Sequence, residues 1–273
     1  MAATSPASVA AAPWRALFLE HISKLDDPYM SVATVGRDAD SGRPVPRVRT
    51  CGFRGFFGEL PLHHLAERQL KEENQLNPRI YESEMLSFTT DVRMEKVEHF
   101  DASDGAVEVV FWVKAVMAQW RLRGKALVIG DEASKPAEQA ARAEILKGLR
   151  RRRRGEITNN TSSQTGTEDA DWSWEKEVTA YFANHSPIMR GSFKNPPPGR
   201  PISEKPGDAN LRLGQLVPDL QDPIARKNFR VVVIRVHEVD RLDLSKPEDC
   251  RRWKFTCAPT GDDGRWEEVE LWP

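Results

Sequence analysis

Two basic side chains follow an apolar, Thr-rich segment, and this arrangement is suited to binding a phosphate. Residues 85–91 read Met-Leu-Ser-Phe-Thr-Thr-Asp, a pattern typical of a β-strand. Arg93 and Lys96 follow directly, in a segment that resembles the first turns of a helix. The free N–H groups and the positive dipole end of a helix N-terminus add to such side-chain charges. The segment therefore predicts an anion site where the strand passes into the helix.

Three arginines lie on a predicted hairpin closer to the N-terminus. Residues 29–35 and 47–57 predict two strands that a turn-rich segment joins. On such a strand Arg47 and Arg49 share one face, whereas Arg54 lies on the other. Taken alone, the three side chains are typical of a solvated hairpin face.

Three segments in order resemble one family of proteins. They read Arg-Thr-Cys-Gly-Phe-Arg at 49–54, Phe-Thr-Thr-Asp-Val-Arg-Met-Glu-Lys at 88–96, and Gln-Trp-Arg-Leu-Arg-Gly at 119–124. Their order and spacing resemble the FMN-binding split-barrel flavoproteins related to pyridoxine/pyridoxamine 5'-phosphate oxidase. More narrowly, they resemble the stand-alone FMN-binding subfamily of cyanobacteria, plants and fungi. The match favours Arg49 and Arg54, but not Arg47, as functional residues.

The resemblance implies a set of residues that contact the flavin or its phosphate. These are Arg49, Arg54, Thr89, Thr90, Arg93, Lys96, Gln119 and Arg252. In this reading Arg93 and Lys96 bind the phosphate, and Arg54 lies near the flavin and the substrate phosphate. Gln119 reaches the flavin from the neighbouring subunit, and Arg252 approaches the edge of the isoalloxazine ring. The resemblance thus implies a homodimer with FMN at the subunit interface.

The chain departs from the family pattern at several positions. Met94 stands where the family usually has Ser, and Glu95 places an anion beside the expected phosphate. The family's substrate-phosphate segment, Tyr-Phe-x-x-Arg, is matched only by Tyr181 and His185, with His in place of Arg. A neutral His is a poorer partner for a phosphate than a guanidinium. Residues 248–250 also lack the family's Arg-x-His pair.

These observations predict an FMN-binding flavoprotein, an oxidoreductase similar to pyridoxamine/pyridoxine 5'-phosphate oxidase that acts on a small molecule of unassigned identity. We find no convincing general base, and no nucleophile with a partner base at a recognisable spacing, so the catalytic residues are unassigned. Because the vitamin B6 substrate residues are mostly missing, the alternative is a non-catalytic protein that binds FMN or another planar cofactor.

Composition sets the broad class of the protein. The chain has 273 residues, with 40 Lys and Arg against 41 Asp and Glu, which gives no overall attraction to nucleic acid or membranes. Three cysteines are too few for a disulfide framework or a zinc site, so we expect a reducing compartment and no metal. No apolar segment approaches the length of a membrane span. We therefore expect a cytoplasmic protein without membrane contact.

A run of arginines, Arg150 to Arg154, forms a local concentration of charge. Such a run can dock on phosphates or act as a nuclear import signal, which makes a nuclear location an alternative. The following residues have a linker's composition, so a flexible insertion over 150–170 is favoured. No basic face with interleaved aromatics accompanies the run, so nucleic-acid binding is not expected.

The elements that must position these residues are mostly strands. Helices are predicted at 13–25, 60–77, 136–154 and 172–184, and further strands at 107–113, 120–129, 229–239, 251–257 and 266–271. The Pro- and Gly-rich segment 187–222 should be irregular. We predict a mainly β (α+β) fold, an antiparallel split β-barrel of about six to eight strands with peripheral helices. A single domain is expected over 13–273, after a disordered N-terminus at 1–12.

Overall fold

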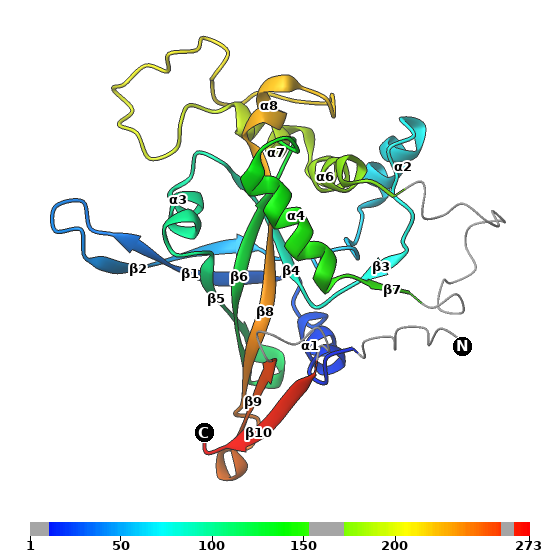
Figure 1. The fold of residues 1–273 in the computed structure, drawn as a ribbon, viewed down its shortest axis with the longest axis vertical. Coiled ribbons are helices and arrows are strands. Elements are labelled where there is room, and N and C mark those ends of the chain that lie inside the picture. Colours follow the sequence, from blue (N-terminus) through cyan, green and yellow to red (C-terminus); the bar gives the residue numbers. More distant parts are fainter. Residues whose placement is uncertain (1–10, 153–171, 258–264) are drawn as a thin grey trace, which may run out of the picture.

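The computed structural model describes residues 11–152, 172–257 and 265–273 (Figure 1). Most of the expected N-terminal tail (1–12) and most of the expected insertion (150–170) lie outside these ranges. The last two residues of the arginine run, Arg153 and Arg154, lie outside them as well.

One strongly curled antiparallel sheet forms the body of the protein. Its strands follow the order β10-β9-β8-β6-β5-β1-β2, and β4 pairs separately with β8. The strands are β1 Tyr29–Arg37, β2 Pro44–Gly52, β4 Leu86–Asp91, β5 Ala106–Val113, β6 Ala118–Ile129, β8 Phe229–Asp243, β9 Arg251–Cys257 and β10 Trp266–Leu271. This sheet of eight strands confirms the predicted mainly β (α+β) class and its antiparallel pairing.

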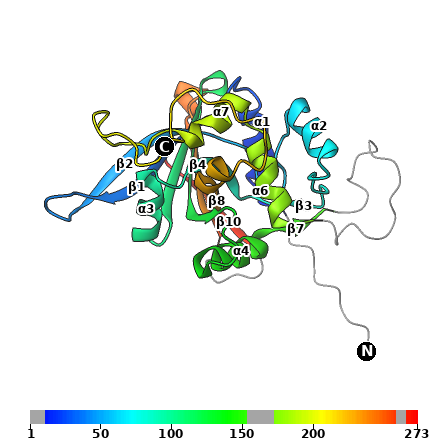
Figure 2. The same cartoon turned by 90° about the horizontal axis from the view of Figure 1, so that it is seen from above.

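The helices lie around this sheet. They are α1 Arg15–Ile22, α2 His64–Glu72, α3 Glu95–Ala102, α4 Pro136–Gly148, α6 Trp174–Ala183, α7 Pro187–Gly191 and α8 Pro223–Asn228. The β1–β2 hairpin projects on one side of the molecule, next to α3, while α2 and α6 lie on the opposite side (Figures 1 and 2).

Side-chain periodicity explains why the central strands form. In β5 buried and accessible residues alternate, so that Phe111 is fully buried and Trp112 is 45% exposed on the other face. The first part of β8 is buried on both faces because β4 and β6 flank it. Its continuous apolar run, Val231 to Ile234, matches that position.

Two apolar cores pack on the sheet. In the first, Phe18 of α1 makes edge contacts with Phe53, Phe111 and Trp120. The second lies under α4 and α6, where Phe182 packs against the start of β8.

The helix predicted over 136–154 is wrong in its last part. Helix α4 ends at Gly148, because Leu149 is extended, and Arg150–Arg151 form a short strand, β7, that pairs with β3 Tyr81–Glu82. The Arg150 guanidinium forms ion pairs with Glu82 and Glu84. The chain therefore turns into an extended path in which partly buried carboxylates hold the first arginine of the run.

Candidate functional site

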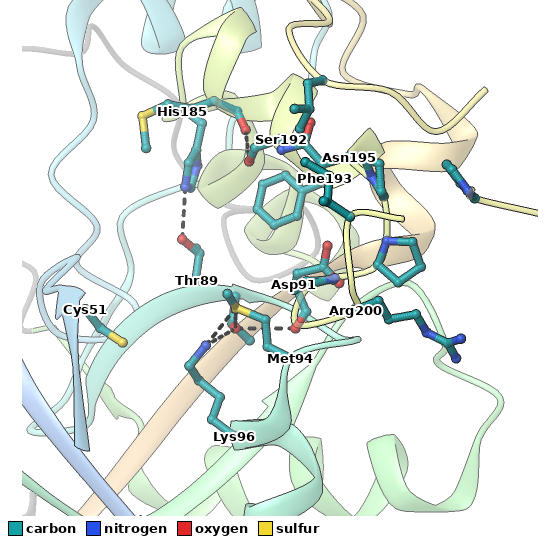
Figure 3. A pocket seen from close by; sticks show the side chains of 18 of the residues that line it. Cys51, Thr89, Asp91, Met94, Lys96, His185, Ser192, Phe193, Asn195 and Arg200 are labelled. Carbon is teal, nitrogen blue, oxygen red and sulfur yellow. Dashed lines mark hydrogen bonds between the residues drawn. The ribbon is translucent and has the colours of Figure 1, made fainter. Parts of the chain in front are cut away.

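A large cavity opens beside the junction of β4 and α3 (Figure 3). Its volume is about 1050 Å³, at the upper end of the range for ligand sites. The end of β2, the end of β4, the start of α3, α7 and the segment 195–213 contribute its walls. Four of the predicted flavin contacts and the predicted substrate residue His185 line it together; the four are Arg54, Thr89, Thr90 and Lys96.

The turn from β4 into α3 is built around Asp91. Its carboxylate accepts a hydrogen bond from the Arg93 backbone N–H at 2.8 Å, and the Met94 N–H donates to the Asp91 carbonyl at 3.1 Å. This turn sends the chain into α3 one residue before Lys96. Glu95 is exposed and does not line the cavity, so the anion next to the predicted phosphate site points away from it.

Lys96 is the buried cation at one end of the cavity. Its side chain is among the buried charged groups, with 6% of the residue exposed. Nζ donates to Thr90 Oγ1 at 3.1 Å and lies 2.8 Å from Met94 Sδ. Burial lowers the pKa of Lys96, and Arg49 lowers it further. Among the described residues no carboxylate forms an ion pair with this ammonium, so its charge is available to an anionic ligand.

Arg54 is the corresponding cation at the other end. Its Nη2 lies 3.3 Å from His185 Nε2, and its Nε is buried with no hydrogen-bond partner among the described residues. Burial also lowers the pKa of Arg54. Within the described part of the chain this guanidinium, too, forms no ion pair with a carboxylate.

The state of His185 follows from its partners. Its Nδ1 lies 2.9 Å from the Tyr181 carbonyl oxygen, which can only accept, so Nδ1 carries the proton. Nε2 is then an acceptor, for the Thr89 hydroxyl at 2.9 Å and for Arg54. Burial, together with Arg54, lowers the pKa of His185 from 6.5 to about 4. The imidazole is therefore neutral near pH 7, with its lone pair on the Thr89 and Arg54 side.

Arg93 and Arg49 lie beside the cavity rather than on its wall. The Arg93 guanidinium forms a two-point ion pair with Asp91 and donates to the backbone carbonyls of Phe193 and Asn195. Arg49 Nη1 donates to Thr34 Oγ1 at 2.6 Å. Arg93 thus fastens the start of the 195–213 segment to β4, and its charge is already matched by a carboxylate.

Tyr181 likewise lies behind the wall. Its side chain is 1% exposed, and its hydroxyl donates to Ser87 Oγ at 2.8 Å. Through its backbone carbonyl it fixes the orientation of His185. Its position therefore suits a support for the site.

Gln119 and Arg252 lie far from the other predicted contacts. Thr90 pairs with Arg230 of β8, whereas Gln119 pairs with Leu242 of the same strand, and Leu242 pairs with Arg252. The two β8 positions are twelve residues apart (242 − 230 = 12), or about 40 Å along the strand at ~3.3 Å per residue. One flavin nucleotide cannot contact both ends of β8 within one protomer.

Arg252 is held in place by Asp240. This carboxylate accepts hydrogen bonds from both Arg252 and Arg121, with shortest distances of 2.7 and 2.8 Å. The two arginines lower the pKa of Asp240 against the opposing effect of burial. Two guanidinium groups share one carboxylate, so this group of three side chains carries a net positive charge.

The sequence did not reveal the outer wall of the cavity. The segment 195–213 was predicted only as irregular, yet its prolines and Ile202 line the site. The Gln215 amide closes the base of this loop by donating to the carbonyls of Lys194, Asn210 and Arg212. Gly191 permits the approach, because a Cβ there would lie 1.8 Å from the Gln215 carbonyl oxygen. In the sequence, the cluster Pro196-Pro197-Pro198 was the feature that could have drawn attention to this wall.

Other site classes find no support in the described residues. Within 11–152, 172–257 and 265–273, no group of three or more His, Cys, Asp or Glu could hold a metal ion. In the same ranges, no helix is both long and apolar enough to cross a membrane.

Comparisons with known structures agree with this fold. The structure of a pyridoxamine 5'-phosphate oxidase-related, FMN binding protein from Nostoc punctiforme aligns with a TM-score of 0.56 and 21% identity, over 97% of this chain and 100% of that one. PhzG from Burkholderia lata aligns at 0.41 and 12%, over 95% and 89%. A general stress protein 26-related protein from Clostridium acetobutylicum aligns at 0.36 and 11%, over 89% and 94%. The last two TM-scores are too low to carry an argument.

Sequence comparison identifies the N-terminal part more specifically. No curated protein matches the chain. The family model described as pyridoxamine 5'-phosphate oxidase, FMN-binding domain, matches residues 11–130, which include β1 to β6 and seven of the eight predicted flavin contacts, all but Arg252. Residues 11–130 are therefore similar to the FMN-binding domain of pyridoxamine 5'-phosphate oxidase, which supports FMN as the cofactor.

Proposed function

We propose that the protein binds FMN in the cavity beside β4 and α3 and works as an FMN-dependent oxidoreductase. The observation that carries the proposal is that two cations, the buried Lys96 and the half-buried Arg54, line one cavity without a carboxylate partner among the described residues. Buried charges in proteins are normally paired, and an anionic cofactor would supply the missing partner.

The Lys96 end suits the FMN phosphate. A phosphate needs positive charge and oriented donors, which Lys96 Nζ, the Thr90 hydroxyl and the first turn of α3 offer together. Arg93 acts indirectly, by holding the turn through Asp91. Arg49 adds positive potential behind Lys96, since it contributes to the lowered Lys96 pKa.

The flavin would lie between this end and Arg54, along Thr89. FMN, when bound, supplies the hydride chemistry. The chain's own part is to bind the cofactor, orient the substrate and limit the access of water. Neutral His185 can accept a hydrogen bond beside the flavin but, with a pKa of about 4, it is a poor proton donor at neutral pH.

We further propose a homodimer in which each site takes Gln119 and Arg252 from the other protomer. Support comes from the separation along β8, which puts these residues out of reach of Lys96 in the same protomer. The residues of this end also form an accessible row across four paired strands, Trp112, Gln119, Leu242 and Arg252. A two-fold axis would bring such a row to the partner's cavity.

The alternative is that the protein holds FMN, or another planar cofactor, without turnover. A specific observation favours it: His185 stands where relatives of the vitamin B6 oxidase type carry an arginine for the substrate phosphate, and it is neutral. Under this alternative the cavity would bind the cofactor tightly and no reductant would react with it.

Visible absorption of the purified protein tests the proposal. We expect a yellow protein whose flavin bleaches anaerobically with at least one member of a panel of oxidisable small molecules that includes pyridoxine 5'-phosphate. Stable flavin absorbance with no bleaching across the panel would support the non-catalytic alternative. A colourless protein that does not take up added FMN would contradict both.

For the location we propose the cytoplasm. The nuclear alternative needs an accessible arginine run, but Arg150 pairs with Glu82 and Glu84, and Arg152 pairs with Glu59. Imaging of the tagged full-length chain, with and without the run, separates the two locations.

A further inference from the structure

The cavity has two distinct ends, and Thr89 of β4 lies between Lys96 at one end and His185 at the other (Figure 3). Thr89 contacts His185, whereas Thr90 contacts Lys96. The phosphate assigned above occupies the Lys96 end. The opposite end contains Arg54 and His185, which are in hydrogen-bond contact with each other. The volume of about 1050 Å³ lies at the upper end of the range for ligand sites, which leaves space for a small second molecule next to the cofactor.

Arg54 supplies the positive charge at this second end. The remaining cavity-lining cations of the described residues are Lys96 at the far end and Arg200 and Lys205 on the exposed 195–213 loop. Arg200 pairs with Glu204. The inner wall here therefore presents a single cation with no carboxylate partner.

His185 restricts what can lie beside that cation. Its protonated Nδ1 is bound to the Tyr181 carbonyl, so its Nε2 presents a lone pair next to Arg54 and Thr89. A lone pair attracts a hydrogen-bond donor and repels an anionic oxygen. An anion at this end can be matched by Arg54 but receives no help from His185.

The remaining wall suits a flat apolar body. Tyr29 lies across from Gly52, where no side chain separates it from the cavity, and it is close enough to Arg54 to affect its pKa. Phe193 also lines the cavity, and its ring lies 6.0 Å from the His185 ring. Two aromatic side chains in the lining favour a planar ligand.

We propose that the Arg54–His185 end binds a substrate with a planar apolar body and a single carboxylate, and that it disfavours phosphate monoesters. The inference rests on the proposed function, because FMN is assigned to the Lys96 end. A carboxylate carries one charge and matches one guanidinium. A phosphate monoester carries about −1.5 to −2 at pH 7, which would leave roughly one charge unmatched beside Arg54. The Lys96 end differs because the Thr90 hydroxyl and the first turn of α3 add to its single cation.

Matched ligands on the FMN-loaded protein test this inference. Benzoate, benzamide and phenyl phosphate share one ring and differ in charge. Calorimetric titration gives their affinities, and the shift in visible absorbance of the bound flavin reports whether they lie beside it. We expect benzoate to bind about tenfold or more tightly than either benzamide or phenyl phosphate.

Substitutions at Arg54 and His185 show which residue causes the preference for benzoate. Arg54→Gln should weaken benzoate by roughly 10- to 100-fold, while Arg43→Gln, at the exposed hairpin turn, should change nothing. His185→Arg should reverse the preference by strengthening phenyl phosphate about tenfold. If the His185→Arg protein does not fold, His185→Gln serves instead. It should keep the preference for benzoate, because Gln retains a hydrogen-bond acceptor.

Failure of this inference can be told apart from failure of the proposed function. A protein that retains FMN but binds phenyl phosphate as tightly as benzoate, or binds neither, overturns the inference alone. So does benzoate binding that Arg54→Gln leaves unchanged. A protein that does not take up FMN contradicts the proposed function itself.

Discussion

Replacing Lys96 by Met should weaken FMN binding and, at the same time, stabilise the protein without cofactor. Methionine is close to lysine in length and apolar, so it fills the same buried space between Thr90 and Met94 without the charge. Replacing a residue that is needed only for folding would lower both the affinity for FMN and the stability of the apoprotein. A loss of affinity together with a gain in stability therefore indicates a cation that serves to bind a ligand.

The magnitude follows from the burial of Lys96. A hydrogen bond to a charged group contributes about 1.5–3 kcal/mol, and a buried charge left without its partner costs about 3–5 kcal/mol. We expect Lys96→Met to reduce the free energy of FMN binding by about 2–4 kcal/mol, which is roughly 30- to 700-fold in Kd.

The effect on stability has the other sign because burial lowers the pKa of Lys96 below 10.5. The folded state holds this proton less tightly than the unfolded state, so the charged form destabilises the fold. Lys96→Met should raise the free energy of unfolding of the apoprotein by about 1 kcal/mol. This gain should shrink as the pH rises from the lowered pKa toward 10.5, because the folded wild type then releases the proton.

Two assays measure the pair of effects. Quenching of FMN fluorescence gives the Kd of the apoprotein, and urea unfolding gives its stability. Lys71→Met is the matched control, since Lys71 lies exposed on α2, where it pairs with Glu67. A folded Lys96→Met protein with unchanged Kd for FMN would refute the phosphate assignment.

Three further outcomes follow. As the pH falls from 6.5 to about 4, His185 is protonated in the unfolded chain before it is protonated in the folded protein. In urea unfolding, the stability of the wild type should therefore drop by about 3 kcal/mol more than that of His185→Gln. Equal losses of stability would contradict the neutral imidazole. Each mixed dimer of a Lys96→Met and a Gln119→Ala protomer contains one intact site, so co-refolding should restore FMN binding to one of the two sites in every mixed dimer. No recovery would exclude sites shared between protomers. Arg150→Met should lower the free energy of unfolding by about 1–3 kcal/mol, because it leaves the partly buried carboxylates of Glu82 and Glu84 unpaired, and an unchanged urea midpoint would contradict this role of Arg150.

Local patterns in the sequence were sufficient for most of the elements. Alternation over 107–113 and the apolar run of 229–239 correspond to β5 and β8, and the segment 85–91 corresponds to β4. The pairing of β4 with β8 could not be predicted, because it joins residues such as Thr90 and Arg230 that are far apart in the chain. Tertiary packing decides which strands pair in a sheet, and no local sequence pattern records that pairing.

The candidate site was predicted in part for the same reason. Thr89, Thr90 and Lys96 lie close in sequence, and one strand–helix junction brings them to one cavity. Arg93 was predicted to face the phosphate, yet it pairs with Asp91 two residues before it. That acidic neighbour was visible in the sequence and is the local signal that was overlooked.

The prediction that the helix continues into the arginine run is wrong because tertiary contacts hold this segment extended. Intrinsic propensity favours a helix through Arg150, but its partners Glu82 and Glu84 lie on a distant segment and hold the chain extended. The outer wall at 195–213 has no periodic pattern at all, so only the folded chain places it at the cavity.

Comparing riboflavin with FMN tests the central claim most directly, because the two ligands differ only by the phosphate. For the wild-type apoprotein we predict that FMN binds roughly 30-fold or more tightly than riboflavin, and that Lys96→Met removes most of this difference. Equal affinities of the wild type for both ligands, or a difference that survives in Lys96→Met, would show that Lys96 does not hold the phosphate.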